Sequence, residues 1–248
     1  MKEVLLVTGS GRGIGAATAL LASQRGYAVC INYRSDAGAA EALRERIVTA
    51  GGEAIAVQAD VAVEADVQRL FATIDAQLGP ITALVNNVGV LEKQCKLTEM
   101  SVERLHRVFT TNVISYFLCC KEAVLRMSTA RGGQGGRIVN VSSGASRVGS
   151  PNVYIDYAAS KGAVDTLTLG LSKEVAAEGI RVNCVRPGLI YTEIHASGGD
   201  PGRVERMAAT VPMQRGGQPE EVAEAILWLL SPQSSYVSGA FIDAAGAR

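Results

Sequence analysis

The sequence predicts an α/β fold in which helices cover both faces of a parallel sheet. Short and wholly apolar segments, such as residues 4–7, are typical of strands that are buried on both faces of such a sheet. Segments with helical periodicity separate these strands along the whole chain. A glycine-rich turn follows the first strand and opens a helix. Together these observations predict a single-domain, Rossmann-type, doubly wound sheet of about seven strands.

The expected elements alternate in chain order. We expect strands at 4–7, 28–32, 54–58, 83–86, 137–141, 180–185 and 240–242, and helices at 16–25, 36–50, 64–77, one or two within 98–127, 155–177 and 218–230. The last helix has a typical start, because Pro219 is followed by two acids near the positive end of the helix dipole. Residues 190–218 show no clear pattern. A long loop in a compact domain is usually functional, so we expect this segment to be a lid over the site.

Composition narrows the classes of function. The 248 residues are 48% apolar, and 24 basic residues balance 24 acidic ones, so we expect no nucleic-acid partner. No apolar run approaches the roughly 20 residues of a membrane span, and no signal-peptide pattern opens the chain. The five cysteines lack CxxC spacing, which favours buried free thiols in the cytoplasm over a disulfide framework. With two histidines as well, we expect no metal site.

The glycine-rich turn runs from Thr8 to Gly15 between the first strand and the first helix. Glycines let a backbone approach a pyrophosphate, and the helix N-terminus offers free N–H groups to it. No GK[ST] sequence ends the turn, which disfavours an NTPase phosphate loop. The turn therefore predicts a dinucleotide site, with a plain tight turn as the alternative.

Tyr157 and Lys161 are four residues apart in the helix expected at 155–177, so they share one face. A phenol has a pKa near 10, and an adjacent ammonium lowers it. Such a pair can act as a general acid or base on an alcohol or carbonyl. The alternative is a tyrosine and a lysine that merely share a helix surface.

These motifs together resemble the short-chain dehydrogenase/reductase family over essentially the whole chain. The glycine turn matches the family's TGxxxGxG pattern, and Asn86 to Gly89 matches its NNAG, with Val88 in place of alanine. The resemblance implies a catalytic tetrad of Asn112, Ser143, Tyr157 and Lys161. It also implies that Pro187, Gly188 and Thr192 belong to a segment that grips the nicotinamide. Within the family, this sequence most resembles bacterial oxidoreductases of the glucose 1-dehydrogenase-like and 3-oxoacyl-reductase-like groups.

The resemblance assigns a role to each member of the tetrad. Ser143 polarises the carbonyl, Tyr157 transfers the proton, Lys161 lowers the Tyr157 pKa and binds the ribose, and Asn112 holds a water. The family's serine usually lies about thirteen positions before its tyrosine, whereas Ser143 lies fourteen before Tyr157, which we expect to alter the shape of the substrate pocket. Ser142 and Tyr154 are the rival candidates, but Ala158 rather than a lysine follows Tyr154 by four.

The end of the second expected strand predicts the cofactor. An acid there usually binds the ribose of NAD, but this chain has Tyr33, Arg34 and Ser35. Arg34 and Arg12 are suited to a 2′-phosphate, so we expect NADP(H), with use of NAD(H) left open. The full expected set of cofactor-binding residues is Gly9, Ser10, Arg12, Gly13, Ile14, Gly15, Tyr33, Arg34, Ser35, Asp60, Val61, Asn87, Gly89, Tyr157, Lys161, Pro187, Gly188, Ile190 and Thr192.

The sequence thus favours a cytoplasmic, NADP(H)-dependent oxidoreductase that interconverts a carbonyl and a secondary alcohol. The alternative is a catalytically idle NADP-binding sensor or regulatory subunit, for which a complete tetrad is unnecessary. The apolar stretch 113–124 and the apolar C-terminal segment predict a homotetramer. His195 lies in the expected lid and is a weaker candidate for contact with a small-molecule substrate.

Overall fold

The structure is a computed structural model that describes residues 2–248. It contains one seven-stranded sheet in the order β3-β2-β1-β4-β5-β6-β7, and every neighbouring pair is parallel. The strands are β1 (Glu3–Val7), β2 (Tyr27–Tyr33), β3 (Glu53–Gln58), β4 (Ala83–Asn86), β5 (Gly136–Val141), β6 (Ile180–Pro187) and β7 (Phe241–Ala244). The predicted fold class, a single doubly wound domain, is confirmed.

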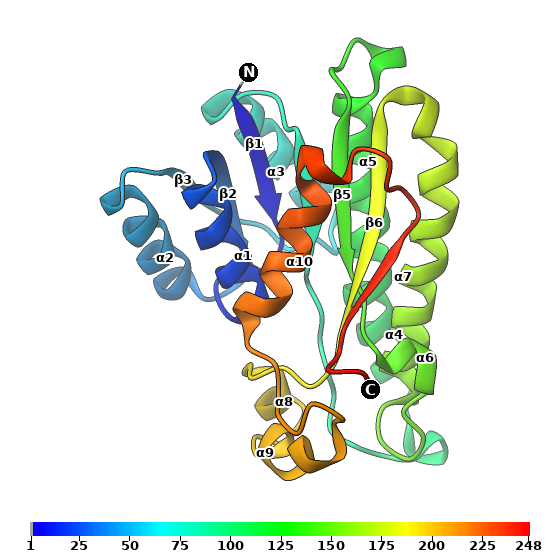
Figure 1. The fold of residues 1–248 in the computed structure, drawn as a ribbon. Helices are drawn as coiled ribbons and strands as arrows, with labels where there is room; N and C mark the ends of the chain where they lie inside the picture. Colours follow the sequence, from blue (N-terminus) through cyan, green and yellow to red (C-terminus); the bar gives the residue numbers. More distant parts are fainter. Residues whose placement is uncertain (1) are drawn as a thin grey trace.

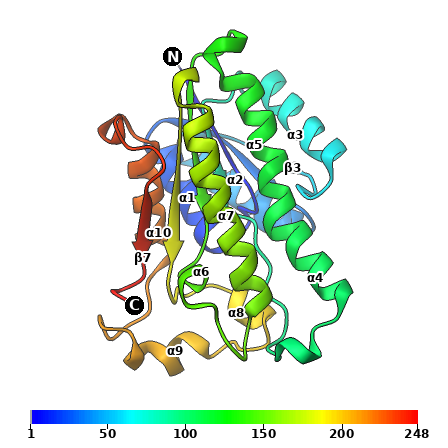
Figure 2. The same ribbon diagram turned by 90° about the vertical axis from the view of Figure 1, so that its right-hand side faces the viewer.

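Helices cover both faces of the sheet (Figures 1 and 2). One face carries α1 (Gly13–Gln24), α2 (Ala37–Thr49) and α10 (Pro219–Leu230). The other carries α3 (Glu64–Gln77), α5 (Ser115–Met127) and α7 (Ile155–Glu174). Each strand sends alternate side chains to the two layers, so Leu5 and Val7 pack under α1 and α10, while Val4 and Leu6 pack under α3 and α5.

The predicted helical stretch 98–127 is more irregular than its sequence indicates. It contains α4 (Val102–Phe109), a π-helical turn η2 (Thr110–Ile114) and α5. The run Val102–Met127 would by length and mean hydropathy be able to span a membrane, but half of its apolar window is buried inside the fold. Its inner side, including Cys119 and Ala123, packs in the core under the sheet, as expected of a core helix.

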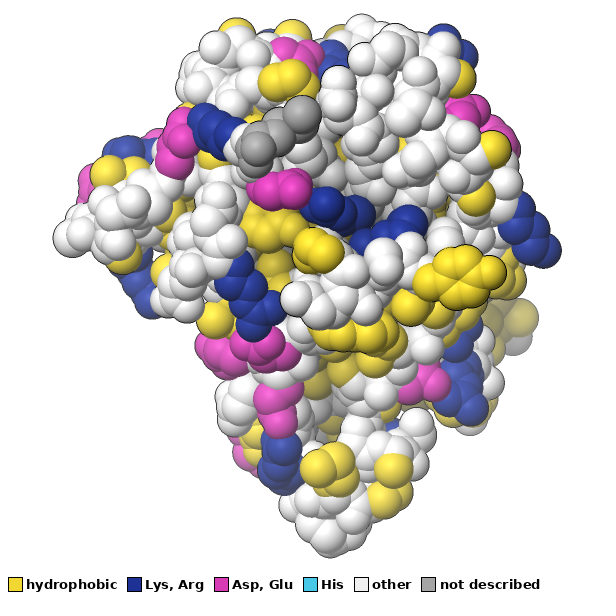
Figure 3. Space-filling model, turned by 45° about the horizontal axis from the view of Figure 1, so that its top comes forward, with side chains coloured by type: hydrophobic (Ala, Val, Ile, Leu, Met, Phe, Trp, Pro, Cys, Tyr) yellow, Lys and Arg dark blue, Asp and Glu magenta, His cyan; other side chains and the backbone are white. Residues whose placement is uncertain are grey.

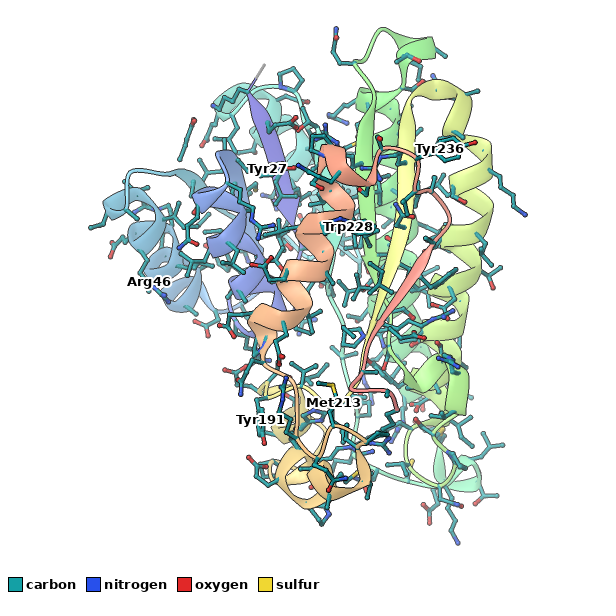
Figure 4. All side chains as sticks on the ribbon, viewed as in Figure 1. Tyr27, Arg46, Tyr191, Met213, Trp228 and Tyr236 are labelled. Carbon is teal, nitrogen blue, oxygen red and sulfur yellow. The ribbon has the colours of Figure 1, made fainter. Side chains whose placement is uncertain are left out.

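The segment expected to be a lid contains short helices that the sequence does not reveal, α8 (Ile194–Ser197) and α9 (Arg203–Met207). They lie beyond the carboxyl ends of the strands (Figures 1 and 4, where Tyr191 and Met213 mark this region). The two ends of the segment meet, because Tyr191 N–H donates to the Gly217 carbonyl at 2.9 Å. A further short helix, α6 (Ala145–Val148), follows β5 and is also absent from the predicted elements.

Strand order reverses between β1 and β4, since β2 and β3 lie on one side of β1 and the later strands on the other. Ligands of open α/β sheets bind at such a switch point, beyond the carboxyl ends of the strands. The glycine-rich turn follows β1 at this edge, and Asn87 to Gly89 follow β4. The fold therefore brings together motifs that are far apart in the sequence.

Candidate active site

A cavity of about 400 Å³ opens at the carboxyl ends of the strands. The expected site residues that line it are Gly9, Arg12, Gly13, Ile14, Arg34, Ser35, Asp60, Val61, Asn87, Gly89, Ser143, Tyr157, Lys161, Pro187, Gly188, Ile190 and Thr192. They come from the ends of six strands and from α1 and α7. The rivals Ser142 and Tyr154 and the lid residue His195 line it as well.

Four expected residues do not line the cavity. The Ser10 hydroxyl turns inward and donates to the Val7 carbonyl at 2.8 Å, and Tyr33 packs against the apolar core. Gly15 lies in tight packing, since a Cβ there would be 2.6 Å from Asn87 Nδ2. Asn112 is fully buried behind the cavity wall. These four positions support the site from outside it.

The glycine turn is fastened to β4 by hydrogen bonds. Asn87 Nδ2 donates to the carbonyls of Thr8 and Gly9, while Thr8 Oγ1 accepts from Asn87 N–H at 3.0 Å. Gly9 and Gly13 have φ of 61° and 55°, a conformation that only glycine adopts readily. The turn therefore leaves its backbone open to the cavity at the start of α1, as a pyrophosphate-binding turn requires.

Asn32 is a supporting residue that the sequence analysis missed. Its Oδ1 accepts from Gly9 N–H at 3.2 Å, and its Nδ2 donates to the Ala59 carbonyl at 3.1 Å. It thereby ties the ends of β2 and β3 to the glycine turn. The signal available in the sequence was a polar residue inside an apolar strand, directly before Tyr33.

Basic and hydroxyl groups surround the cavity at the end of β2. Arg12, Arg34 and Ser35 all line this end, and the Arg34 side chain is 64% exposed. Its nearest carboxylate is Asp60, at 3.9 Å, which is a weak and solvated contact. Arg34 is thus free to reorient toward an anion that enters here.

Tyr157 lies on α7 and lines the opposite end of the cavity. Burial raises the pKa of its phenol to about 12, and a hydrogen bond with Ser143 opposes that rise. The rival Ser142 instead donates its hydroxyl proton to the Lys161 carbonyl at 3.1 Å. The geometry therefore places Ser143, rather than Ser142, beside the Tyr157 hydroxyl.

Lys161 departs from the expected arrangement. Its Nζ lies 5.8 Å from the centre of the Tyr157 ring, but it donates to the Tyr116 hydroxyl at 3.1 Å and to the Val141 carbonyl at 2.9 Å. Burial lowers the Lys161 pKa to about 8. The expectation that Lys161 lowers the pKa of Tyr157 is not met, because burial dominates and raises that pKa.

Tyr116 is the second residue that the sequence analysis missed. It lies on α5 and is 1% exposed, and the carbonyl oxygens of Val88 and Val141 lie 3.0 and 2.8 Å from its hydroxyl and share its single proton. The same hydroxyl accepts from Lys161. Tyr116 thus joins β4, β5 and the lysine at one buried point.

Asn112 occupies the π-helical turn that interrupts the helix between α4 and α5. Its Oδ1 accepts from Val90 N–H at 2.8 Å, and its Nδ2 donates to the Val90 carbonyl and to Ser160 Oγ at 3.1 Å each. Both side-chain N–H groups are therefore already used. The side chain holds the wall of the cavity at Val90 and the helix of Tyr157 in register.

The segment after β6 closes the cavity from the side of the lid. A Cβ on Gly188 would lie 2.7 Å from the Ala245 backbone, so this segment packs directly on the end of β7. Thr192 lies against the glycine turn, since its Cγ2 is 3.2 Å from the Cβ position of Gly13. The segment expected to grip a nicotinamide thus runs from the end of β7, at Gly188, to the pyrophosphate turn, at Thr192.

Comparison with known proteins identifies a close group of relatives. Residues 9–246 match a family model described as enoyl-(acyl carrier protein) reductase. The chain is 60% identical over 245 residues to the uncharacterized oxidoreductase YgfF of Escherichia coli, covering 99% of each chain. It is 38% identical over 238 residues to the 3-oxoacyl-[acyl-carrier-protein] reductase of Synechocystis, covering 96% of this chain and 93% of that one.

A solved structure has the same architecture. A double mutant of a Serratia marcescens short-chain dehydrogenase/reductase superimposes with a TM-score of 0.90 at 31% identity. The match covers 99% of this chain and 97% of that one.

Proposed function

The chain belongs to the short-chain dehydrogenase/reductase family of oxidoreductases, and on that premise we propose that it interconverts a carbonyl and a secondary alcohol with NADP(H). One observation carries the proposal. Tyr157, Ser143 and Lys161 lie in the same cavity as the glycine turn and the two arginines at its far end. A proton-transfer group and a dinucleotide site thus share one space, as hydride transfer requires.

The residues present fit the cofactor. Gly9 and Gly13 adopt the left-handed backbone that opens the turn, and the start of α1 presents free N–H groups. Arg12 and Arg34 supply positive charge for a 2′-phosphate, and the acid typical of an NAD site is absent from the end of β2. Asp60 and Val61 line the wall where the adenine would lie. When bound, NADP(H) supplies or accepts the hydride.

The protein's own groups handle the proton. With a pKa raised to about 12, the Tyr157 phenol is protonated at neutral pH and can donate to a carbonyl oxygen as the hydride arrives. Ser143 is placed to donate a hydrogen bond to the same oxygen. A protonated Tyr157 phenol and a Ser143 hydroxyl that donates a hydrogen bond favour reduction of the carbonyl over oxidation of the alcohol. Lys161 lies close enough to stabilise the phenolate that remains.

The test is a carbonyl panel with NADPH, using wild type and Tyr157→Phe. We expect wild type to consume NADPH with at least one substrate, and the variant to bind NADPH normally but to lose about 10²- to 10⁴-fold in kcat. Tyr27→Phe is the matched control, because Tyr27 begins β2 at the end of the strand opposite the cavity and does not line it. Normal NADPH binding without turnover of any carbonyl would favour the idle sensor instead.

We further propose a homotetramer in the cytoplasm. Large apolar side chains are exposed along α4, η2 and α5, namely Val102, Phe109, Ile114, Phe117 and Leu125. A second group includes Trp228 of α10 and Tyr236 before β7, both labelled in Figure 4. Figure 3 shows apolar side chains gathered across the middle of the face that it displays. Exposed apolar patches of this kind mark interfaces. All five cysteines are free thiols, which suits a reducing compartment.

A further inference from the structure

The substrate end of the cavity combines apolar walls with one guanidinium that lacks a hydrogen-bonded acceptor. Val90, Leu91, Val148 and Ile194 supply the apolar walls. Arg203, at the start of α9, lines the same cavity with only 16% of its side chain exposed. Its guanidinium carries five donors, and those that face the cavity are open to a ligand.

The neighbouring carboxylate does not satisfy Arg203. Asp200 accepts from Arg206 through both oxygens, at 2.9 and 2.5 Å, and from Gln94 at 2.9 Å. Arg203 comes no closer to it than 3.6 Å, and within residues 2–248 its side chain makes no hydrogen bond. Arg206 therefore hydrogen-bonds the carboxylate, whereas Arg203, which faces the cavity, forms only a longer ion pair with it.

Two neighbours fix the position of Arg203. Its guanidinium lies 5.4 Å from the centre of the Tyr154 ring, a cation–π distance. Tyr154 occupies the position directly before α7, three residues before Tyr157, so Arg203 faces the cavity close to the proton donor. His195 does not compete for an anion, because its Nε2 is directed at the Ile190 carbonyl and burial lowers its pKa.

We propose that Arg203 binds an anionic oxygen group of the substrate, so that this enzyme acts on carbonyl compounds that carry a carboxylate or a phosphate. The inference rests on the proposed oxidoreductase function of the same cavity. The flat guanidinium can give two parallel hydrogen bonds to such a group, while the apolar walls take the carbon chain between the group and the carbonyl. The anion would supply the acceptors that the protein does not.

The experiment compares matched substrate pairs with NADPH: an oxo acid against its methyl ester, and a phosphorylated ketone against its free alcohol. We expect wild type to prefer the anionic member of one pair, and that pair identifies the group. Arg203→Met should lower kcat/KM for that member by roughly ten- to a hundredfold, mainly through KM, and change the neutral member little.

Arg46→Met is the matched control, because Arg46 is an exposed arginine of α2 that does not line the cavity. Arg248→Met tests the exposed C-terminal arginine that also lines the cavity. Neither should alter the preference. If wild type prefers the neutral members, or if Arg203→Met affects both members equally while NADPH binding and thermal stability stay normal, the assignment of Arg203 is wrong.

A direct binding measurement keeps the two proposals separate. If no carbonyl is turned over, the proposed function fails, but calorimetric titration of the NADPH-bound protein with butanoate and with methyl phosphate still tests Arg203. Binding of one of these ions to wild type, weakened tenfold or more in Arg203→Met and unchanged in Arg46→Met, supports the anion site. No binding to wild type, or equal binding to both variants, overturns it.

Discussion

The buried ammonium of Lys161 should reduce the stability of the fold, and removing it should therefore stabilise the protein. Its pKa falls from 10.5 to about 8 because burial penalises the charge. At about 1.4 kcal/mol per pKa unit, keeping it charged at pH 7 costs roughly 3 kcal/mol. Lys161→Met also removes two hydrogen bonds, worth about 1 kcal/mol each. The Val141 carbonyl keeps its bond from Tyr116, so we expect a net gain of about 1–2 kcal/mol.

The effect has a defined pH dependence. Between about pH 8 and 10.5 the unfolded chain binds more protons at Lys161 than the folded one, so wild type gains stability as the pH rises through this range. The variant lacks this gain. Its advantage over wild type should therefore be full below about pH 8 and should disappear toward pH 10.5.

The assay is urea unfolding of wild type and Lys161→Met at several pH values between 7 and about 10.5, with the free energy of unfolding extrapolated to water. Lys121→Met is the matched control, because Lys121 is exposed and pairs with Glu64 at 2.9 Å on the surface. It should show little change at any pH. If Lys161→Met is less stable than wild type at pH 7, or if the difference does not depend on pH, the buried charge of the lysine does not destabilise the fold.

Three further predictions concern the cofactor, the buried tyrosine and the assembly. Arg34→Ala should weaken NADPH by roughly ten- to a hundredfold and leave NADH nearly unchanged; equal losses in kcat/KM for both cofactors would contradict the phosphate contact. Tyr116→Phe removes an acceptor of the Lys161 ammonium and should lower the Lys161 pKa, so the loss of kcat/KM at alkaline pH should begin about one pH unit lower than in wild type; an unchanged pH profile would refute this role of Tyr116. Light scattering should give a tetramer, whereas Phe117→Asp, on the exposed side of α5, should give smaller species; a monomeric wild type at micromolar concentration would refute the assembly.

The fold could be predicted because a parallel sheet requires a distinctive pattern of apolar strands and amphipathic helices in the sequence. The stretches 64–77 and 83–86 have the observed limits, and the other predicted strands differ from the observed ones by no more than two residues at either end. Buried strands must be continuously apolar, and their connecting helices must be amphipathic, whatever the protein does. The segment with α8 and α9 shows no such apolar pattern, because these short helices bury only a small cluster around Val204.

The site could be predicted only where the chemistry needs a fixed residue type at a fixed spacing. Gly9, Gly13, Tyr157 and Lys161 meet that condition, and all four line the cavity. Tyr116 does not, because its hydroxyl meets Lys161 from a helix 45 residues away in sequence. Contacts of this kind depend on how helices pack against the sheet, which no local spacing records.

The pKa values of Tyr157 and Lys161, the proposed catalytic pair, explain why a destabilising lysine would be kept. Burial favours the neutral phenol of Tyr157 and disfavours the ammonium of Lys161, so the resting site holds a charge without a carboxylate partner. Once Tyr157 has donated its proton, the ammonium 5.8 Å from its ring centre faces a phenolate. At an effective dielectric constant of about 20, two unit charges about 6 Å apart attract by roughly 3 kcal/mol. This is about the free energy that burying the ammonium costs the fold, and it appears only as the proton leaves, which is the condition for accelerating the step.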